Sequence, residues 1–319
     1  MSVYFKGLSS INGPLVAVEG VKDASFDELV ELVDDNDHTR LGRVIEIQGE
    51  RALIQVFENT EGMSTKNVVT KFSGKPIELG LSQEILGRSF NGSGVPIDGL
   101  GPVYTDKFMD INGRVINPVA RVYPRDFINT GISAIDGLNT LIRGQKLPIF
   151  SGSGLSHNEL AAQIVRQAKI ISEKEEPFAI VFAAMGVKHD VAAFFKQTFL
   201  EHGVMDHVTM FLNLANDPII ERILTPRFAL TAAEYLAFEK DMHILVVMSD
   251  ITSYCEALRE YSSSKEEIPG RKGYPGYLYS DLASMYERAG CIEGSAGSLT
   301  QIPILTMPND DISHPIADC

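Results

Sequence analysis

From about residue 146 onwards, short apolar runs alternate with amphipathic segments, and this alternation constrains the fold more than any other feature of the sequence. The apolar runs are strand-sized and occupy 146–150, 179–185, 207–213, 243–250 and 299–308. Between them lie segments whose apolar residues repeat with helical spacing. Because strands that alternate with helices form parallel sheets covered on both faces, we predict an α/β core. Ligands of such sheets bind beyond the carboxyl ends of the strands, which directs the search for a site.

The first part of the chain has a different pattern, in which Gly and Pro interrupt short apolar runs. Residues 42–57 alternate around a turn at Gly49, which predicts a β-hairpin. Several short strands at close spacing predict a small β-barrel or sandwich. Residues 24–33 have helical spacing instead, so we expect a short helix there. The apolar residues on its face are Phe26, Leu29, Val30 and Val33.

A glycine-rich connector over 75–124 shows no sustained period and predicts turns and short strands. We therefore predict two domains, a small N-terminal β-barrel over 1–75 and an α/β domain over 76–319.

Charge and cysteine content exclude several classes of function. The chain has 28 Lys+Arg against 42 Asp+Glu, a formal net charge of −14. An acidic surface repels phosphate backbones, so we expect no nucleic-acid partner. Cys255, Cys291 and Cys319 form no CxxC pair and the histidines are scattered, so we expect no metal site. No apolar run approaches the roughly 20 residues of a membrane span, so we expect that the chain does not cross a membrane by itself.

The turn after the strand at 146–150 lies where a phosphate-binding loop of the form GxxxxGK[ST] would be expected. Such a loop wraps phosphate with backbone N–H groups, neutralises it with Lys and holds magnesium with a hydroxyl. Here His157 replaces the Lys and Asn158 replaces the hydroxyl, so we expect no ATP hydrolysis at this loop. The helix N-terminus still offers a weak anion site, and an ordinary βα turn explains the loop equally well. The candidate loop consists of Ser151, Gly152, Ser153, Gly154, Leu155, Ser156, His157 and Asn158.

Four long segments together resemble the B subunits of V/A-type rotary ATPases: 86–103, 127–164, 221–263 and 267–290. The resemblance extends over the whole chain. It implies a RecA-like parallel-sheet core behind the barrel. It also implies that the B-subunit family continues beyond Cys319 into a segment with an arginine finger and a helical C-terminal domain, so we expect a chain truncated before that domain.

The resemblance further implies a noncatalytic regulatory subunit that alternates with catalytic A subunits in the head of an ion-translocating ATPase. Its partners would be the A subunit, the central rotor shaft and the peripheral stalk, at the cytoplasmic face of the membrane. Membrane contact would pass only through the ion-translocating sector, which moves protons or sodium. The chain itself would require no cofactor, and MgATP or ADP would bind at the interface with the catalytic subunit.

Two positions support the noncatalytic interpretation. Where a catalytic subunit carries Gly-Glu-Arg, this sequence has Gly186-Val187-Lys188, and a valine can perform no proton transfer. Asp250 follows the strand where a catalytic chain places its magnesium-associated Asp, although a structural cap explains a carboxylate there at least as well. We therefore expect no catalytic residue in this chain.

The resemblance also implies surfaces for neighbouring subunits. Arg227, Asp250 and Arg259 are candidates for the subunit interface, and surface ion pairs are the alternative for the two arginines. A rotor-facing loop would present Tyr274 as an exposed apolar ring and use Arg271 and Lys272 to attract an acidic shaft. A simple helix–helix connector is the alternative. The candidate loop residues are Pro269, Gly270, Arg271, Lys272, Tyr274 and Pro275.

Two other classes of function remain as alternatives. One is a self-sufficient RecA-type hexameric ATPase motor, such as a helicase or a protein-export ATPase. The missing lysine argues against it, and the acidic charge argues against an RNA translocase. The other is a separate binding module that uses the altered loop for a different anion.

Overall fold

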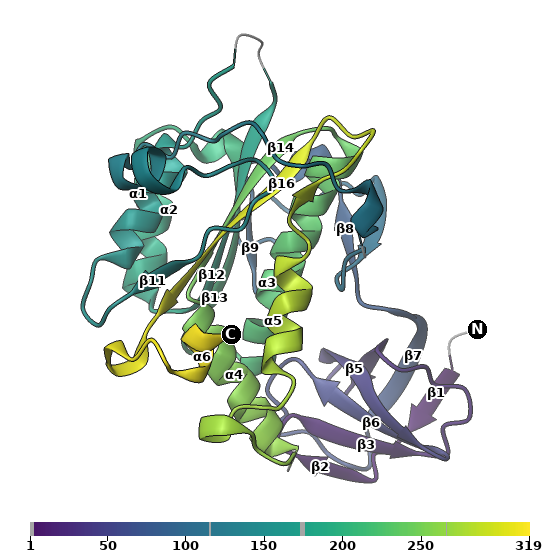
Figure 1. Cartoon of the computed structure of the whole chain (residues 1–319). Coiled ribbons are helices and arrows are strands. Elements are labelled where there is room, and N and C mark those ends of the chain that lie inside the picture. The colour runs from purple at the N-terminus through teal and green to yellow at the C-terminus, as the bar shows by residue number, and fades with distance from the viewer. Residues whose placement is uncertain (1–2, 115, 173–175, 266) are drawn as a thin grey trace. The chain divides into compact units, whose positions relative to one another are not determined.

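The computed structural model describes residues 3–114, 116–172, 176–265 and 267–319 (Figure 1). The chain divides into two compact units. One consists of residues 1–78, with Pro218–Glu221 grouped with it, and the other consists of 79–217 and 222–319.

The first unit is an antiparallel sheet of seven strands in the order β1-β7-β4-β5-β6-β3-β2. Side chains that alternate inward along these strands form one core, in which Val16, Val30, Leu32, Val44 and Ile54 are fully buried. The predicted hairpin is confirmed, because β5 and β6 pair from Gln48 and Arg51 around a Gly49 with φ of +61°. The strands are β1 (Val3–Lys6), β2 (Ser10–Asn12), β3 (Leu15–Glu19), β4 (Glu28–Val33), β5 (Thr39–Gln48), β6 (Arg51–Val56) and β7 (Val69–Pro76).

The prediction of a helix over residues 24–33 is wrong. Most of this segment is strand β4, which pairs with β5 on one side and β7 on the other. Burial alternates along the strand: Val30 and Leu32 are fully buried, whereas Phe26, which precedes the strand, is 73% exposed. Strand pairing on two sides satisfies the backbone along the segment, and this outweighs a short stretch of helical spacing.

The second unit is built on a parallel sheet in the order β11-β16-β14-β12-β13-β9, as the alternation of strands and helices predicts. Its strands are β9 (Ser89–Asn91), β11 (Ile149–Ser151), β12 (Phe178–Val187), β13 (Val208–Leu214), β14 (His243–Ser249) and β16 (Ser298–Thr306). Short strand β15 (Gly290–Cys291) pairs with β16 in the antiparallel sense, and β8 (Glu78–Leu81) pairs with β10 (Lys107–Asp110) outside this sheet.

Helices cover both faces of the parallel sheet, with α1 and α2 on one face and α3, α4 and α5 on the other (Figure 1). The core beneath α1 and α2 includes a cluster of three phenylalanines, in which the ring of Phe182 lies 4.5 Å from that of Phe195 and 5.4 Å from that of Phe199. The helices are α1 (His157–Gln167), α2 (His189–Glu201), α3 (Ile219–Glu234), α4 (Ile251–Ser264), α5 (Leu278–Tyr286) and α6 (Pro315–Asp318).

Strand β9 was not predicted individually, because it lies inside the glycine-rich connector. Its three residues pair in parallel with β13 and extend the sheet by one strand. An ion pair secures it: Arg88 Nε lies 2.5 Å and Arg88 Nη2 3.0 Å from the carboxylate of Asp98. The hydrogen bond from Arg88 lowers the pKa of Asp98 to about 2.

A buried ion pair holds α3, α5 and the connector together. Arg288, just after α5, donates to Glu234 at 2.7 and 2.9 Å, and both side chains are 4% exposed. The same guanidinium donates to Thr231 Oγ1 at 2.7 Å and to the carbonyl of Ile111 at 3.0 Å. Because the charges are paired and the remaining N–H groups are bonded, the desolvation cost of burial is offset.

We expect Glu234→Ala to lower the free energy of unfolding by about 3–5 kcal/mol, because it leaves a buried guanidinium without its counter-charge. Glu287→Ala is the matched control: this carboxylate pairs with Arg121 and Lys146 but is 62% exposed. Its loss should cost at most about 1 kcal/mol. Urea unfolding followed by circular dichroism measures both, and equal losses in the two variants would contradict the assignment.

Candidate functional site

The parallel pairing brings the ends of β11, β12, β13, β14 and β16 to one edge of the sheet. At this edge Ser151 ends β11 opposite Thr306 of β16, and the backbone N–H of Met307 donates to the Ser151 carbonyl at 2.8 Å. The loop then passes through Gly154, with φ of +78°, and enters α1 at His157. The predicted strand–loop–helix arrangement is therefore confirmed.

The side chains of this loop do not fit a magnesium-bound triphosphate. Ser156 occupies the N-cap position but makes no side-chain capping bond. His157 turns its Nδ1 to the carbonyl of Leu155 at 3.2 Å, and Leu155 itself is 63% exposed. His157 and Asn158, in the first turn of α1, supply neither the ammonium nor the hydroxyl that the chemistry requires. The backbone N–H of Ser153 already donates to a carboxylate of the same chain, Asp310 Oδ1, at 2.6 Å.

Asp250, directly after β14, is used as a structural connector. Its Oδ1 accepts from the backbone N–H of Thr252 at 2.9 Å and caps α4. The same carboxylate accepts from the backbone N–H and the hydroxyl of Thr306, at 3.2 and 2.7 Å. Asp250 therefore joins the start of α4 to the end of β16, which is the structural alternative weighed for this residue.

Asn213 at the end of β13 was not singled out by the sequence analysis. Its Oδ1 accepts from the backbone N–H of Gly186 and from Arg222 Nε, both at 3.0 Å. In the sequence Asn213 is distinguished only as a polar residue at the end of an apolar run, and this pattern is too common to identify a functional residue. Val187 pairs with Leu214, the residue after Asn213, and its side chain can accept no proton.

Arg227 on α3 uses its charge inside the unit. Its Nη2 lies 2.5 Å from Asp281 Oδ1, and both side chains are 15% exposed. Tyr254 of α4 donates its hydroxyl to the same carboxylate, and burial raises the pKa of that phenol. This triad connects α3, α4 and α5, and a role for Arg227 at a subunit interface stays a prediction.

The loop between α4 and α5 contradicts one expectation directly. Tyr274 is 3% exposed and does not present its ring to solvent. Its hydroxyl donates to Glu256, and its ring lies 5.5 Å from the guanidinium of Arg259 and 5.6 Å from the ring of His314. The polar partner and the stacked cation make burial of this tyrosine favourable, and the sequence pattern does not show them.

The two cations of that loop are also paired. Arg271 Nη1 lies 2.9 Å from Asp318, and Lys272 Nζ lies 3.0 Å from Asp311. The hydroxyl of Ser313, followed by Lys272, lowers the pKa of Asp311 to about 2. Each cation therefore has a counter-charge within the chain, and attraction of an acidic shaft by these two side chains stays a prediction.

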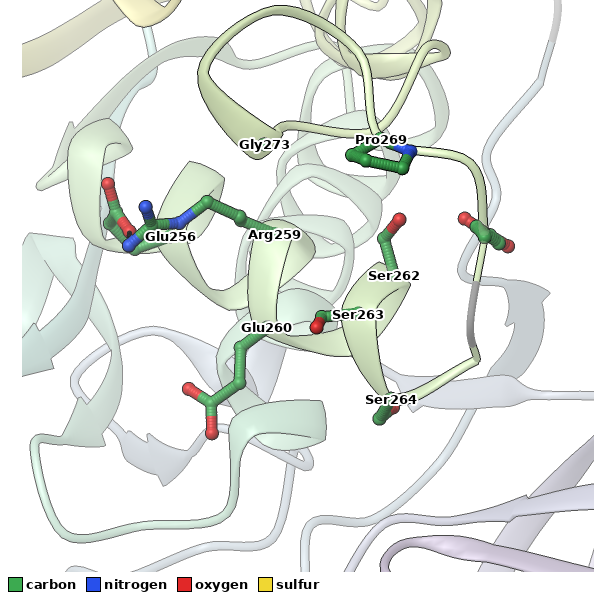
Figure 2. A pocket seen from close by; sticks show the side chains of 9 residues that line it. Glu256, Arg259, Glu260, Ser262, Ser263, Ser264, Pro269 and Gly273 are labelled. Carbon is green, nitrogen blue, oxygen red and sulfur yellow. Dashed lines mark ion pairs between the residues drawn. The ribbon is translucent and has the colours of Figure 1, made fainter.

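A hollow of about 860 Å³ lies between the end of α4 and the loop that follows (Figure 2). Arg259 on its wall pairs with Glu256 and is 48% exposed at the side chain. Glu260 and Glu267 make the remaining charge of the lining acidic. Pro269 and Gly273 belong to the predicted rotor-facing loop and form the opposite wall.

Two general properties hold for the part of the chain that the structure describes. None of its helices combines the length and apolarity needed to span a bilayer. Nor do three His, Cys, Asp or Glu side chains come together there in a way that could hold a metal ion.

Comparison with known proteins identifies two family regions and close relatives. Residues 8–72 match the beta-barrel domain of the ATP synthase alpha/beta family, and residues 131–319 match its nucleotide-binding domain. The V-type ATP synthase beta chain 2 of Clostridium tetani is 65% identical over 312 residues, which are 98% of this chain and 68% of that protein. The V-type ATP synthase beta chain of Halothermothrix orenii is 62% identical over 98% of this chain and 68% of that protein. The beta chain 2 of Treponema pallidum is 60% identical over 99% of this chain and 66% of that protein.

We expect Asp250→Ala to lower the free energy of unfolding by about 1–2 kcal/mol, the usual cost of losing an N-cap side chain. Asp250→Asn should cost less, because the amide oxygen can still accept from Thr252. Urea denaturation distinguishes the two variants. If Ala were as stable as the wild type, the capping role would be wrong and the catalytic alternative for this carboxylate would need to be reconsidered.

Proposed function

The chain belongs to the V-type ATP synthase beta chains of the ATP synthase alpha/beta family, and from this membership we propose that it is a noncatalytic, regulatory subunit of the ATPase head. In this role it alternates with a catalytic A subunit and takes part in coupling ATP synthesis or hydrolysis to the transport of protons or sodium. The relatives favour this assignment over a self-sufficient ATPase motor.

The observation that carries the noncatalytic role is the chemistry of the sheet edge. His157 and Asn158 replace the cation and the magnesium-binding hydroxyl, and Val187 replaces the group that would position water. The carboxylate of Asp250 accepts hydrogen bonds from Thr252 and Thr306. Phosphoryl transfer depends on placing charge and water accurately, and these four residues supply neither the ammonium, nor the magnesium-binding hydroxyl, nor a free carboxylate to position water.

The proposed partners follow from the same role. The chain would bind a catalytic subunit on each side, the rotor shaft centrally and the peripheral stalk outside, as a peripheral protein on the cytoplasmic face of the membrane. MgATP or ADP would lie at the interface with the catalytic subunit, which supplies the phosphate loop. Arg259 is the most accessible of the three interface candidates: its side chain is 48% exposed at the wall of the hollow, where it pairs with Glu256.

We expect the purified chain to release no phosphate from MgATP, and to co-purify with a larger subunit that carries an intact phosphate loop. A triple variant with Ser156→Gly, His157→Lys and Asn158→Thr should gain nucleotide affinity but still show no turnover, because Val187 leaves the water unpositioned. Titration calorimetry and a phosphate-release assay test both parts. Steady turnover by the unmodified chain would favour the self-sufficient motor, and failure to assemble would favour a separate binding module.

The loop over 268–277 supports a second, narrower proposal, that it faces the rotor shaft. Because Tyr274 is buried and the two cations are paired, the contact would be made by the exposed parts of the loop, chiefly Ile268, which is 91% exposed. Proline and glycine keep its surface compact, which suits a sliding contact.

In the assembled complex, we expect a photo-crosslinking residue at position Ile268 to capture a shaft subunit. Leu138 is the matched control, since it is 85% exposed elsewhere in the same unit. The same crosslinker there should not capture the shaft. Capture of only peripheral-stalk subunits from position 268, identified by mass spectrometry, would place this loop on another surface.

A further inference from the structure

A carboxylate of the chain itself lies in the altered phosphate loop. Asp310 Oδ1 accepts from the backbone N–H of Ser153 at 2.6 Å. The same oxygen lies above the Cα of Gly152, so close that a Cβ placed there would be 2.9 Å from it. A backbone N–H and a glycine face without a side chain are the two features by which such loops admit a phosphate oxygen.

The fold places this carboxylate through the pairing of β11 with β16. Ser151 lies opposite Thr306, so the chain that leaves β16 starts beside the loop that leaves β11. Asn309 and Asp310 then adopt left-handed conformations, each with φ of +56°, in a turn that begins at Pro308. Asn and Asp accept this conformation more readily than other residues with a side chain, so the turn is compatible with its sequence.

The position of the carboxylate has two consequences for an incoming anion. The N–H of Ser153 is already engaged in a charge-assisted hydrogen bond, which is among the stronger kinds. A phosphate oxygen that approached the loop would also meet a negative charge at contact distance, where like charges repel most strongly. The missing lysine of the loop makes this repulsion uncompensated.

We propose that Asp310 is an internal anion that occupies the loop and excludes phosphate from it. The inference deepens the noncatalytic role proposed above and rests on it. His157 and Asn158 already deprive the loop of the lysine and the hydroxyl that bind a nucleotide, and Asp310 in addition excludes the phosphate. Asp310 is thereby a specificity-determining residue of this edge of the sheet.

The test measures binding of pyrophosphate and of magnesium-free ADP to the full 319-residue chain by titration calorimetry. We expect Asp310→Gly to bind pyrophosphate at least about tenfold more tightly than the wild type, because it frees the N–H and removes the charge without straining the turn. Asp310→Asn should give a smaller gain, since the amide oxygen still accepts from Ser153 while the charge is gone.

Asp311→Asn is the matched control, because it removes one negative charge from the next residue, whose carboxylate pairs with Lys272 instead. Its affinity should stay within about twofold of the wild type, because this carboxylate is already paired with Lys272 and accepts from the hydroxyl of Ser313. Adding Gly152→Ala to Asp310→Gly should cancel the gain, because the new methyl would fill the space that the carboxylate has left.

Two outcomes would overturn the inference: equal affinities for the Asp310 variants and the wild type, or an equal gain in Asp311→Asn. If Asp310→Gly does not fold, which circular dichroism reveals, Asp310→Asn against Asp311→Asn decides the question alone. These outcomes are separate from failure of the proposed function, which shows itself as ATP turnover by the wild type or as failure to assemble with a larger subunit.

Discussion

The pairing of β16 with β14 on one side and β11 on the other is the constraint on which the rest of the second unit depends. Its parallel sense places Ser151 opposite Thr306 and Ser249 opposite Ile304, so that the three strands end at the same edge. Without it, Asp250 could not bond Thr306 and Asp310 could not reach Ser153. Main-chain hydrogen bonds thus determine which side chains meet, and the side chains then determine what the edge can bind.

The internal pairing of charges is a second consequence of this architecture. Arg227, Arg271 and Lys272 each have a carboxylate partner in the chain. These partners lie 54, 47 and 39 residues away along the sequence. A neighbouring subunit that bound one of these three cations would therefore have to compete with a carboxylate of the same chain.

The sequence predicts the repeating parts of the fold well and the single contacts poorly. Alternating apolar runs identify β12, β13, β14 and β16 because burial on both faces imposes a continuous pattern. The strand β4 was mistaken for a helix because six residues carry too little pattern to separate the two periods. The burial of Tyr274 depends on Glu256, Arg259 and His314, which only the tertiary structure brings together. The contact of Asp310 with the loop was likewise invisible in a sequence where the two segments lie 157 residues apart.

The ion pairs of the loop between α4 and α5 connect it to the segment that follows β16. Arg271 and Lys272 link that loop to Asp318 and Asp311, on the segment that follows β16 and also carries Asp310. Because ion pairs in contact with water contribute only about 0–1 kcal/mol each, this linkage is weak. We therefore expect a displacement of the loop to break these two ion pairs before it disturbs the hydrogen bonds between the strands.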